Sequence, residues 1–414
     1  MQTSTFGPVT TKQRIHLLDI LRGFALLGVL VTNIVEYSGE YSIDTAPSGL
    51  SKWTIDLVRV LSEGSFYPLY SLLFGVGFAV WMDKSMKRNG SIWLFIWRSC
   101  ILFFFGYVFI VLIDANPIFL RYAILSIPLL LFSNASPKVL LAGTLIFLLL
   151  GVFHQPISRQ IQQMRSPEEQ TQKMEKIKKQ VQAYQLARRE ADKNKTFSGY
   201  VKARSILFVN LLKGIYTLWD RFLPIIFSMF LLGVFCWRKA FFTNVEKHLS
   251  FWKKIFWIAL VTGLGGQILI LIALLMESKK IIVLNQDILK YAEIILNPVL
   301  TFFYISLIVL IAHKLKGKTN ILLNGLQSAG RMSLTNFFLQ YIVIVIIIYP
   351  YGLGLNQKLF SYYLVLIAFS IFPFQVLFST FWFKYFIYGP MEWLWRSLTY
   401  MKLQSIKRFK KPAI

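Results

Sequence analysis

Long runs of apolar residues constrain the fold of this chain more than any other feature. A helix that crosses a bilayer needs about 20 mostly apolar residues, because every backbone N–H and C=O in the hydrocarbon must be paired within the segment. By this criterion the chain has about ten such runs. They cover residues 17–36, 61–82, 92–113, 117–133, 138–154, 219–237, 255–276, 291–313, 333–351 and 360–383. The sequence therefore predicts an all-α, polytopic membrane bundle of about ten transmembrane helices.

Composition supports the membrane class and argues against soluble ones. Hydrophobic residues make up 56% of the 414 residues and charged residues 15%, whereas typical soluble domains have about 25% charged residues. Cys100 and Cys236 both lie in apolar runs, so neither a disulfide framework nor a cysteine-based metal site is indicated. No other spacing of ligand residues predicts a metal site.

The positive charges indicate the orientation. The formal net charge of +26 would suggest nucleic acid in a soluble protein, but membrane proteins concentrate Lys and Arg in cytoplasmic loops. Placing the N-terminus inside puts the basic segments 83–91, 238–254, 314–332 and 384–414 in the cytoplasm. We therefore expect a multi-pass cell-membrane protein with both termini inside and no nucleic-acid partner. Runs four and five are the shortest, and every later helix would change side if one did not cross.

A polar segment separates two membrane halves. Residues 155–204 are rich in Lys and Arg, and they divide the chain into an N-terminal half, 1–154, and a C-terminal half, 205–414, that ends in a basic tail. Within the polar segment, Ser166 and Pro167 followed by acidic residues are typical of a helix start.

The helix that starts there is predicted to be amphipathic. Met174, Ile177, Val181 and Tyr184 recur at helical spacing and form one apolar stripe. Lysines oppose this stripe at positions 173, 176, 178 and 179. Two interpretations stay open: a helix lying on the membrane surface, or a solvated linker helix packed on its own domain.

Ionisable residues within apolar runs are the first candidates for function, because burying them in a bilayer is costly. Asp19 and Arg22 lie three residues apart near the inner end of the first run and can form an ion pair on one helix face. Arg22 is also placed to meet an anionic ligand from the cytosol. With Arg331 and Arg396 it would form a basic mouth, suited to an acyl-CoA-like anion or to lipid headgroups.

The outer ends of the runs carry a second set of candidates. Asn33 and Glu36, three residues apart, would line an outward-facing pocket together with Asp114 and Glu63. The structural alternative is that Asn33 forms a hydrogen bond between helices.

Three further polar residues complete the candidate set. Asn336 and Gln340, four residues apart in the ninth run, have the same two interpretations as Asn33. His154 is the one histidine at a predicted outer end, and it is the candidate general base because imidazole titrates near neutral pH.

Three stretches, in order along the chain, resemble a known family. They are Asp19-Ile20-Leu21-Arg22-Gly23 with the later Asn33, then Phe66-Tyr67-Pro68-Leu69-Tyr70, then Gly330-Arg331-Met332-Ser333-Leu334-Thr335-Asn336 with Gly389-Pro390-Met391-Glu392-Trp393. The chain is similar in these stretches to the YeiB-like family of bacterial polytopic membrane proteins, a domain of unknown function. That family resembles transmembrane acyltransferases of the heparan-glucosaminide N-acetyltransferase type. The resemblance implies transfer of an acyl group from cytosolic acyl-CoA, as donor, to an acceptor on the outer side.

The chain departs from this family where catalysis is concerned. Family members have a His where this chain has Phe109, and a Gly-Asp pair where it has Asn116-Pro117. His154 and Asp114 are then the remaining catalytic candidates, and whether the chain is an enzyme stays open. The alternatives are a small-molecule transporter or exporter and a non-catalytic membrane partner protein. Expected partners are membrane lipids and a small-molecule or acyl acceptor, and a homodimer is a further open alternative.

Overall fold

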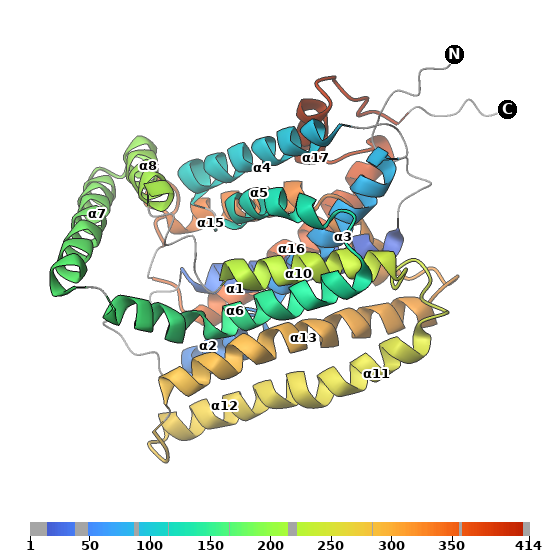
Figure 1. The fold of residues 1–414 in the computed structure, drawn as a ribbon. Coiled ribbons are helices and arrows are strands. Elements are labelled where there is room, and N and C mark those ends of the chain that lie inside the picture. The colour runs from blue at the N-terminus through green and yellow to red at the C-terminus, as the bar shows by residue number, and fades with distance from the viewer. Residues whose placement is uncertain are drawn as a thin grey trace. The chain divides into compact units, whose positions relative to one another are not determined.

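The computed structural model describes residues 15–37, 49–86, 91–114, 116–164, 166–213, 222–283, 285–355 and 358–408. Over these residues the regular structure is helical, apart from a single antiparallel bridge between Phe386 and Lys407 (Figure 1). The predicted all-α class is confirmed.

The helices of the described residues follow one another along the chain. They are α1 (His16–Val35), α2 (Gly49–Leu61), α3 (Phe66–Met86), α4 (Ile92–Ile113), α5 (Ile118–Leu129), α6 (Pro137–Gln163), α7 (Pro167–Asn194), α8 (Phe197–Lys213), α10 (Phe222–Arg238), α11 (Leu249–Ala259), α12 (Gly265–Ser278), α13 (Gln286–Lys314), α14 (Ile321–Arg331), α15 (Ser333–Ile348), α16 (Ser361–Tyr385) and α17 (Pro390–Thr399). A 3-10 turn, Leu130–Phe132, extends α5, and a π-helical turn, Leu260–Leu264, joins α11 to α12.

Seven helical segments of the described chain are long and apolar enough to cross a membrane. They are His16–Val35, Gly49–Lys84, Ile92–Ile113, Pro137–His154, Leu249–Ser278, Asp287–Lys314 and Ser361–Tyr385. An eighth candidate is the pair α14 and α15, which is bent by 84° at the break between them. The protein is therefore a polytopic membrane protein. Two further apolar helices, Ile118–Phe132 and Phe222–Arg238, are shorter and correspond to two of the ten predicted runs.

Two helices lie between the apolar runs, where the sequence pattern predicts no helix. Gly49–Leu61 and Ile321–Arg331 are only 13 and 11 residues long, too short and too polar to be read as apolar runs. Both are held by packing: α2 contacts α12 and α16, and α14 contacts α1 and α16. Residues 1–14, residues 38–48 between α1 and α2, and the end of the basic tail lie outside the described residues.

The chain folds as two compact units. Unit 1 comprises residues 1–97, 229–340 and 357–414, and unit 2 comprises 98–228 and 341–356. The three-part division expected from the alternation of membrane and polar segments stays a prediction.

Helix α1 is the centre of unit 1. It is apolar around most of its circumference, which is the pattern of a helix surrounded by protein, and it contacts α3, α14 and α16. Two glycines allow the closest of these contacts. A Cβ on Gly23 would lie 1.9 Å from the carbonyl oxygen of Leu326, and one on Gly330 would lie 1.8 Å from that of Asp19. The backbones of α1 and α14 are therefore in direct contact.

In unit 2 the polar segment forms a helical hairpin. Helices α7 and α8 pack against each other (Figure 1). The predicted start of α7 is confirmed: Ser166 is the N-cap, its Oγ accepts a hydrogen bond from the backbone N–H of Glu169 at 3.2 Å, and Pro167 is the first helical residue. Helix α6 extends nine residues beyond His154.

Candidate functional site

Helix α1 carries polar side chains at both ends of unit 1. At the inner end predicted from the charges, Arg22 Nη1 donates to Asp19 Oδ1 at 2.8 Å, and the two side chains are 27% and 3% exposed. The ion pair expected from their spacing is therefore present. Tyr70 adds a hydrogen bond from its hydroxyl to the carbonyl oxygen of Arg22, at 3.2 Å.

The break between α14 and α15 lies beside this ion pair, because Gly330 packs on the Asp19 backbone. Arg331, the last residue of α14, holds its guanidinium 3.9 Å from the ring centroid of Phe383. Arg396, on α17, lies 4.7 Å from the ring centroid of Tyr388. Each of these arginines therefore contacts an aromatic ring, and the binding of an anion by a basic mouth stays a prediction.

Glu392, on α17, caps the start of α15 at this break. Its Oε1 accepts from the backbone N–H groups of Leu334 and Thr335 at 2.7 and 3.1 Å, and its Oε2 accepts from the Thr335 hydroxyl at 2.6 Å. A carboxylate at this position complements the positive end of the α15 dipole. Burial raises the pKa of Glu392, and the hydrogen bonds from Thr335 and the backbone offset part of that rise. Nothing local in the sequence connects residue 392 to residue 334, so the sequence pattern does not predict this cap.

Amide side chains join α15 to its neighbours in the middle of unit 1. Asn336 Nδ2 donates to the carbonyl oxygen of Ala329 at 3.1 Å and to Ser379 Oγ at 2.9 Å. Gln340 Nε2 donates to Gln375 Oε1 at 2.9 Å and, at 3.5 Å, to the carbonyl oxygen of Leu26. These are the interhelical hydrogen bonds of the structural interpretation. Gln375 and Ser379 were missed because lone polar residues in an apolar run give no positional signal.

At the opposite end of α1, Asn33 is held by a residue that the sequence did not single out. The Tyr67 hydroxyl donates to Asn33 Oδ1 at 2.7 Å. Asn33 is only 2% exposed, and its Nδ2 has no hydrogen-bond partner among the described residues. Tyr67 follows Phe66 at the start of α3. Only its place in the stretch that resembles the YeiB-like family marks it in the sequence.

Glu36 lies one turn beyond Asn33, just outside the candidate span His16–Val35. The residue keeps an exposed surface at the edge of the bundle, yet desolvation and the negative charge of Glu63 raise its pKa to about 7. Asn33, Glu36 and Glu63 are thus brought to one end of unit 1. Asp114 and His154, the other predicted outer residues, belong to unit 2.

In unit 2, Asp114 is part of a buried cluster of arginines and tyrosines. It follows α4 with a left-handed backbone, φ 53°, and its carboxylate accepts from the Tyr349 hydroxyl and lies 3.5 Å from Nε of the fully buried Arg204. Arg204 also donates to the carbonyl oxygen of Leu112 at 3.0 Å and to the Tyr351 hydroxyl at 3.3 Å. Asp114 is therefore engaged in an ion pair.

Arg188 extends this cluster onto α7. Its Nη1 donates to the Tyr349 hydroxyl at 3.3 Å, and its guanidinium is 4.9 Å from the ring centroids of both Tyr200 and Tyr349. Burial alone would lower the pKa of Arg188, but electrostatic interactions with Tyr349 and with the Asp114 carboxylate raise it above its ordinary value. Arg188 and Arg204 were missed because cations in a polar stretch are usually solvated.

Apolar residues occupy the two positions at which the YeiB-like family has its His and its Asp. Phe109 is fully buried, stacked on Phe105 and edge-on to Phe119 at 5.1 Å. Pro117 is the residue before α5. His154, at the end of the candidate span on α6, is half-buried.

Comparisons with known proteins place the chain in a family. The model of the family described as "Protein of unknown function (DUF418)" matches residues 236–402. YxaH of Bacillus subtilis (strain 168), named as an uncharacterized protein, is 30% identical over 99% of this chain and 100% of its own length. The chain belongs to the DUF418 family.

Other relatives cover nearly the whole DUF418 chain as well. An uncharacterized 39.9 kDa protein in the amylase 3' region of Bacillus acidopullulyticus is 26% identical over 95% of this chain and 96% of its own. YeiB of Escherichia coli (strain K12), also named as uncharacterized, is 24% identical over 92% of this chain and 95% of its own. No solved structure gives a significant match. The YeiB-like resemblance is therefore confirmed.

The DUF418 match covers one part of the site and not the other. Residues 236–402 include the break after Arg331, the amides on α15 and α16, and the Glu392 cap. The α1 residues Asp19, Arg22 and Asn33 lie outside that match, and the nearly full-length relatives cover them instead.

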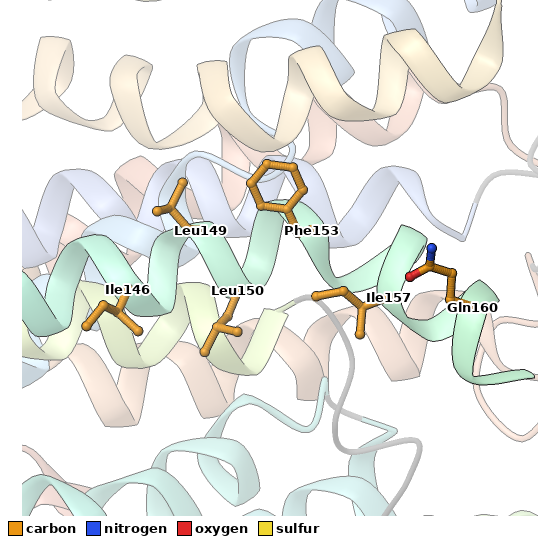
Figure 2. A pocket seen from close by; sticks show the side chains of 6 residues that line it. All are labelled: Ile146, Leu149, Leu150, Phe153, Ile157 and Gln160. Carbon is orange, nitrogen blue, oxygen red and sulfur yellow. The ribbon is translucent and has the colours of Figure 1, made fainter. Parts of the chain in front are cut away.

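The DUF418 chain also has an apolar groove on α6, in unit 2. Its volume is about 540 Å³, and it is lined by Ile146, Leu149, Leu150, Phe153, Ile157 and Gln160 (Figure 2). No ionisable side chain lines it, so it offers a surface for hydrocarbon and no acid–base chemistry. Within the described residues, no group of three or more His, Cys, Asp or Glu could hold a metal ion.

Proposed function

We propose that this DUF418 protein transfers an acyl group from a cytosolic acyl-CoA-type donor to an acceptor on the outer side, with the chemistry at the Asn33 end of α1. The observation that carries the proposal is the Asn33 amide. Its Oδ1 is held by Tyr67 at 2.7 Å, while Nδ2 is buried without a partner among the described residues. A buried donor left unpaired is costly, so the arrangement suits a ligand oxygen that supplies the missing acceptor.

Acyl transfer requires such a donor. Attack on a thioester carbonyl gives a tetrahedral intermediate whose oxygen is negatively charged, and a fixed N–H aimed at that oxygen stabilises it. Tyr67 would act as the positioning residue, because its hydrogen bond fixes which end of the Asn33 amide faces the substrate.

Glu36 is the base that fits this position best. It follows Asn33 by three residues, and a pKa of about 7 lies close to the pH at which a general base is most effective. The Glu36 carboxylate would take the proton from an acceptor O–H or N–H as that atom attacks the carbonyl carbon. Collapse of the intermediate then breaks the C–S bond, and the leaving CoA thiolate takes the proton from Glu36, which returns to its ionised form. His154 stays a prediction because it belongs to unit 2, and Asp114 is already paired with Arg204.

The donor would enter from the opposite end of α1. Arg22 and Asn33 are eleven residues apart, which is about 17 Å along a helix. A CoA-type donor has a flexible arm between its phosphates and its thioester, so phosphates near Arg22 and Arg331 would allow the thioester to approach Asn33. If the shorter helices α5 and α10 also cross, the protein has ten transmembrane crossings and both termini lie in the cytoplasm.

The proposal is tested with purified protein in liposomes, by measuring CoA thiol released from acyl-CoA with and without acceptor amines and alcohols. We expect Asn33→Ala to lower the rate by about 10²–10³-fold, the usual effect of losing an oxyanion donor, and Tyr67→Phe to lower it less. Asn285→Ala is the matched control, since it removes the exposed N-cap amide of α13 and leaves the site intact. A normal rate in Asn33→Ala would rule out this mechanism.

A transporter or exporter is the second candidate, and the bent pair α14–α15 favours it. Discontinuous helices in the middle of a membrane bundle form the binding sites of many transporters, and the 84° break lies beside Asp19 and Arg22. Substrate movement across the liposome membrane without release of CoA would support transport. If the protein neither releases CoA nor moves a solute, a non-catalytic membrane partner is the better account.

A further inference from the structure

The apolar stripe of α7 is covered along one half of the helix and open along the other. Toward the C-terminus, Ala187 and Ala191 are buried, at 9% and 1% exposure, where α8 packs on the helix. Toward the N-terminus, Met174, Ile177 and Val181 are 67%, 40% and 47% exposed. The hairpin therefore accounts for only part of the amphipathic pattern, and the open part needs another apolar surface.

The covered half fixes the direction in which the open half faces. The Tyr200 hydroxyl donates to Asp192, Arg188 donates to Tyr349, and Asn210 Nδ2 donates to the carbonyl oxygen of Gln180 at 3.3 Å. These bonds come from both ends of α8 and from the end of α15, so α7 is not free to rotate about its axis.

Helix α6 brings α7 to the level of the lipid headgroups. Its 27 residues span about 40 Å, which matches the roughly 40–45 Å thickness of a bilayer with its headgroups. Its exposed apolar side continues past the candidate span to Ile157 and Ile161. Only three residues separate Gln163 from Pro167, and Figure 1 shows α7 leaving the line of α6 and running across its end.

The charge of the open half fits an anionic surface. Lys176, Lys178 and Lys179 are exposed, and between residues 170 and 189 the only acidic residue is Glu175. An apolar stripe on one face and lysines on the polar face are the pattern of helices that lie in the interface of anionic membranes.

We propose that the N-terminal half of α7 binds the anionic phospholipid surface on the side where α6 ends, with Met174, Ile177 and Val181 inserted among the headgroups and the positive charge of the lysines attracting the helix to the negative surface. This binding does not depend on the proposed acyl transfer. It assigns the polar segment a role as a lipid-contacting arm of unit 2.

The test places an environment-sensitive fluorophore on a single cysteine in the full-length protein, in nanodiscs of phosphatidylglycerol or of phosphatidylcholine. A probe at Ile177 should be quenched several-fold more strongly by brominated phosphatidylglycerol than a probe at Gln172, which is exposed on the opposite face of α7. The Ile177 signal should fall in phosphatidylcholine and at high salt, because screening weakens the lysine contacts.

Charge removal completes the test. Lys176→Gln with Lys178→Gln and Lys179→Gln should reduce the quenching at Ile177 several-fold. The same three substitutions at the exposed Lys247, Lys253 and Lys254 should leave it unchanged. Equal, weak quenching at Ile177 and Gln172 in both lipids would overturn the proposal. Cross-linking of two Ile177→Cys chains would overturn it too, because a second copy would then cover the stripe.

Discussion

Asn33 and Asn336 are both fully buried amides, and the structure uses them in opposite ways. Asn336 gives both of its donor bonds to protein, to Ala329 and Ser379, and its Oδ1 has no partner within the described part of the chain. Asn33 has its Oδ1 held by Tyr67, and its Nδ2 has no hydrogen-bond partner among the described residues. A free donor is what a developing negative charge requires, so Asn33 is the more informative of the two for catalysis, although a single sequence gives both the same appearance.

Glu392 makes stability depend on pH. Burial raises the pKa of Glu392 in the folded protein above its ordinary value, so the folded form binds the proton more tightly than the unfolded chain does. Its contribution to stability is therefore complete below the unfolded pKa and is lost as the pH rises through the folded pKa. We expect the unfolding temperature in detergent to fall with rising pH above the ordinary glutamate range, and the fall to be smaller in Glu392→Gln.

Removing the side chain separates this titration from the cap itself. Glu392→Ala leaves the N–H groups of Leu334 and Thr335 without their acceptor, which should cost about 1–3 kcal/mol and be visible as a lower unfolding temperature at every pH. If Glu392→Gln keeps the full pH slope of the unmodified protein, another group is responsible.

Among the elements, the hairpin of α7 and α8 depends on a few buried charges. Asp114, Arg204 and Tyr349 lie at its base, and Arg188 connects them to α7. Removing one partner of a buried charged cluster leaves the others uncompensated, so the hairpin should open before the rest of unit 2 does.

Neighbouring arginines on α7 allow a matched test of this. Arg188→Met should speed amide hydrogen exchange or proteolysis within α7 and α8 about tenfold, the effect of a loss near 1.4 kcal/mol. Arg189→Met, one residue on and exposed, should not change either rate. Equal protection in the two variants would mean that helix packing alone holds the hairpin.

The sequence predicts elements well where the signal is local. The apolar runs correspond to the long helices, and the Ser166 cap is where the pattern puts it, because both depend on neighbouring residues. Helix α14 and the α15 cap were missed, since they rest on contacts such as Gly330 with Asp19 and Glu392 with Leu334 that connect distant parts of the chain. The Asn33 and Asp19–Arg22 candidates came from the cost of polar groups in a bilayer, whereas Tyr67 and Arg204 acquire their roles only through folding.

For the whole molecule, the number of crossings decides on which side the polar segment lies. Between Gln172 and Lys402 the candidate spans are Leu249–Ser278, Asp287–Lys314, the bent pair and Ser361–Tyr385. Helix α10 adds a fifth if it crosses. Cysteines at Gln172 and Lys402, both exposed, should therefore react with a membrane-impermeant reagent from opposite sides. Labelling of both from one side would mean an even number of crossings and would remove α10 or the bent pair from the count.

The contact of Gly23 and Gly330 with opposing backbone also sets an order of events during biosynthesis. Helix α1 cannot pack on α14 until α14 has been made, and Gly330 follows Gly23 by 307 residues. At about 5–20 residues per second this takes roughly 15–60 s. During that interval Asp19 and Arg22 are at the membrane without the α14 backbone that packs beside them in the folded protein. The insertion machinery must therefore accommodate the Asp19–Arg22 pair before the helix that packs beside it exists.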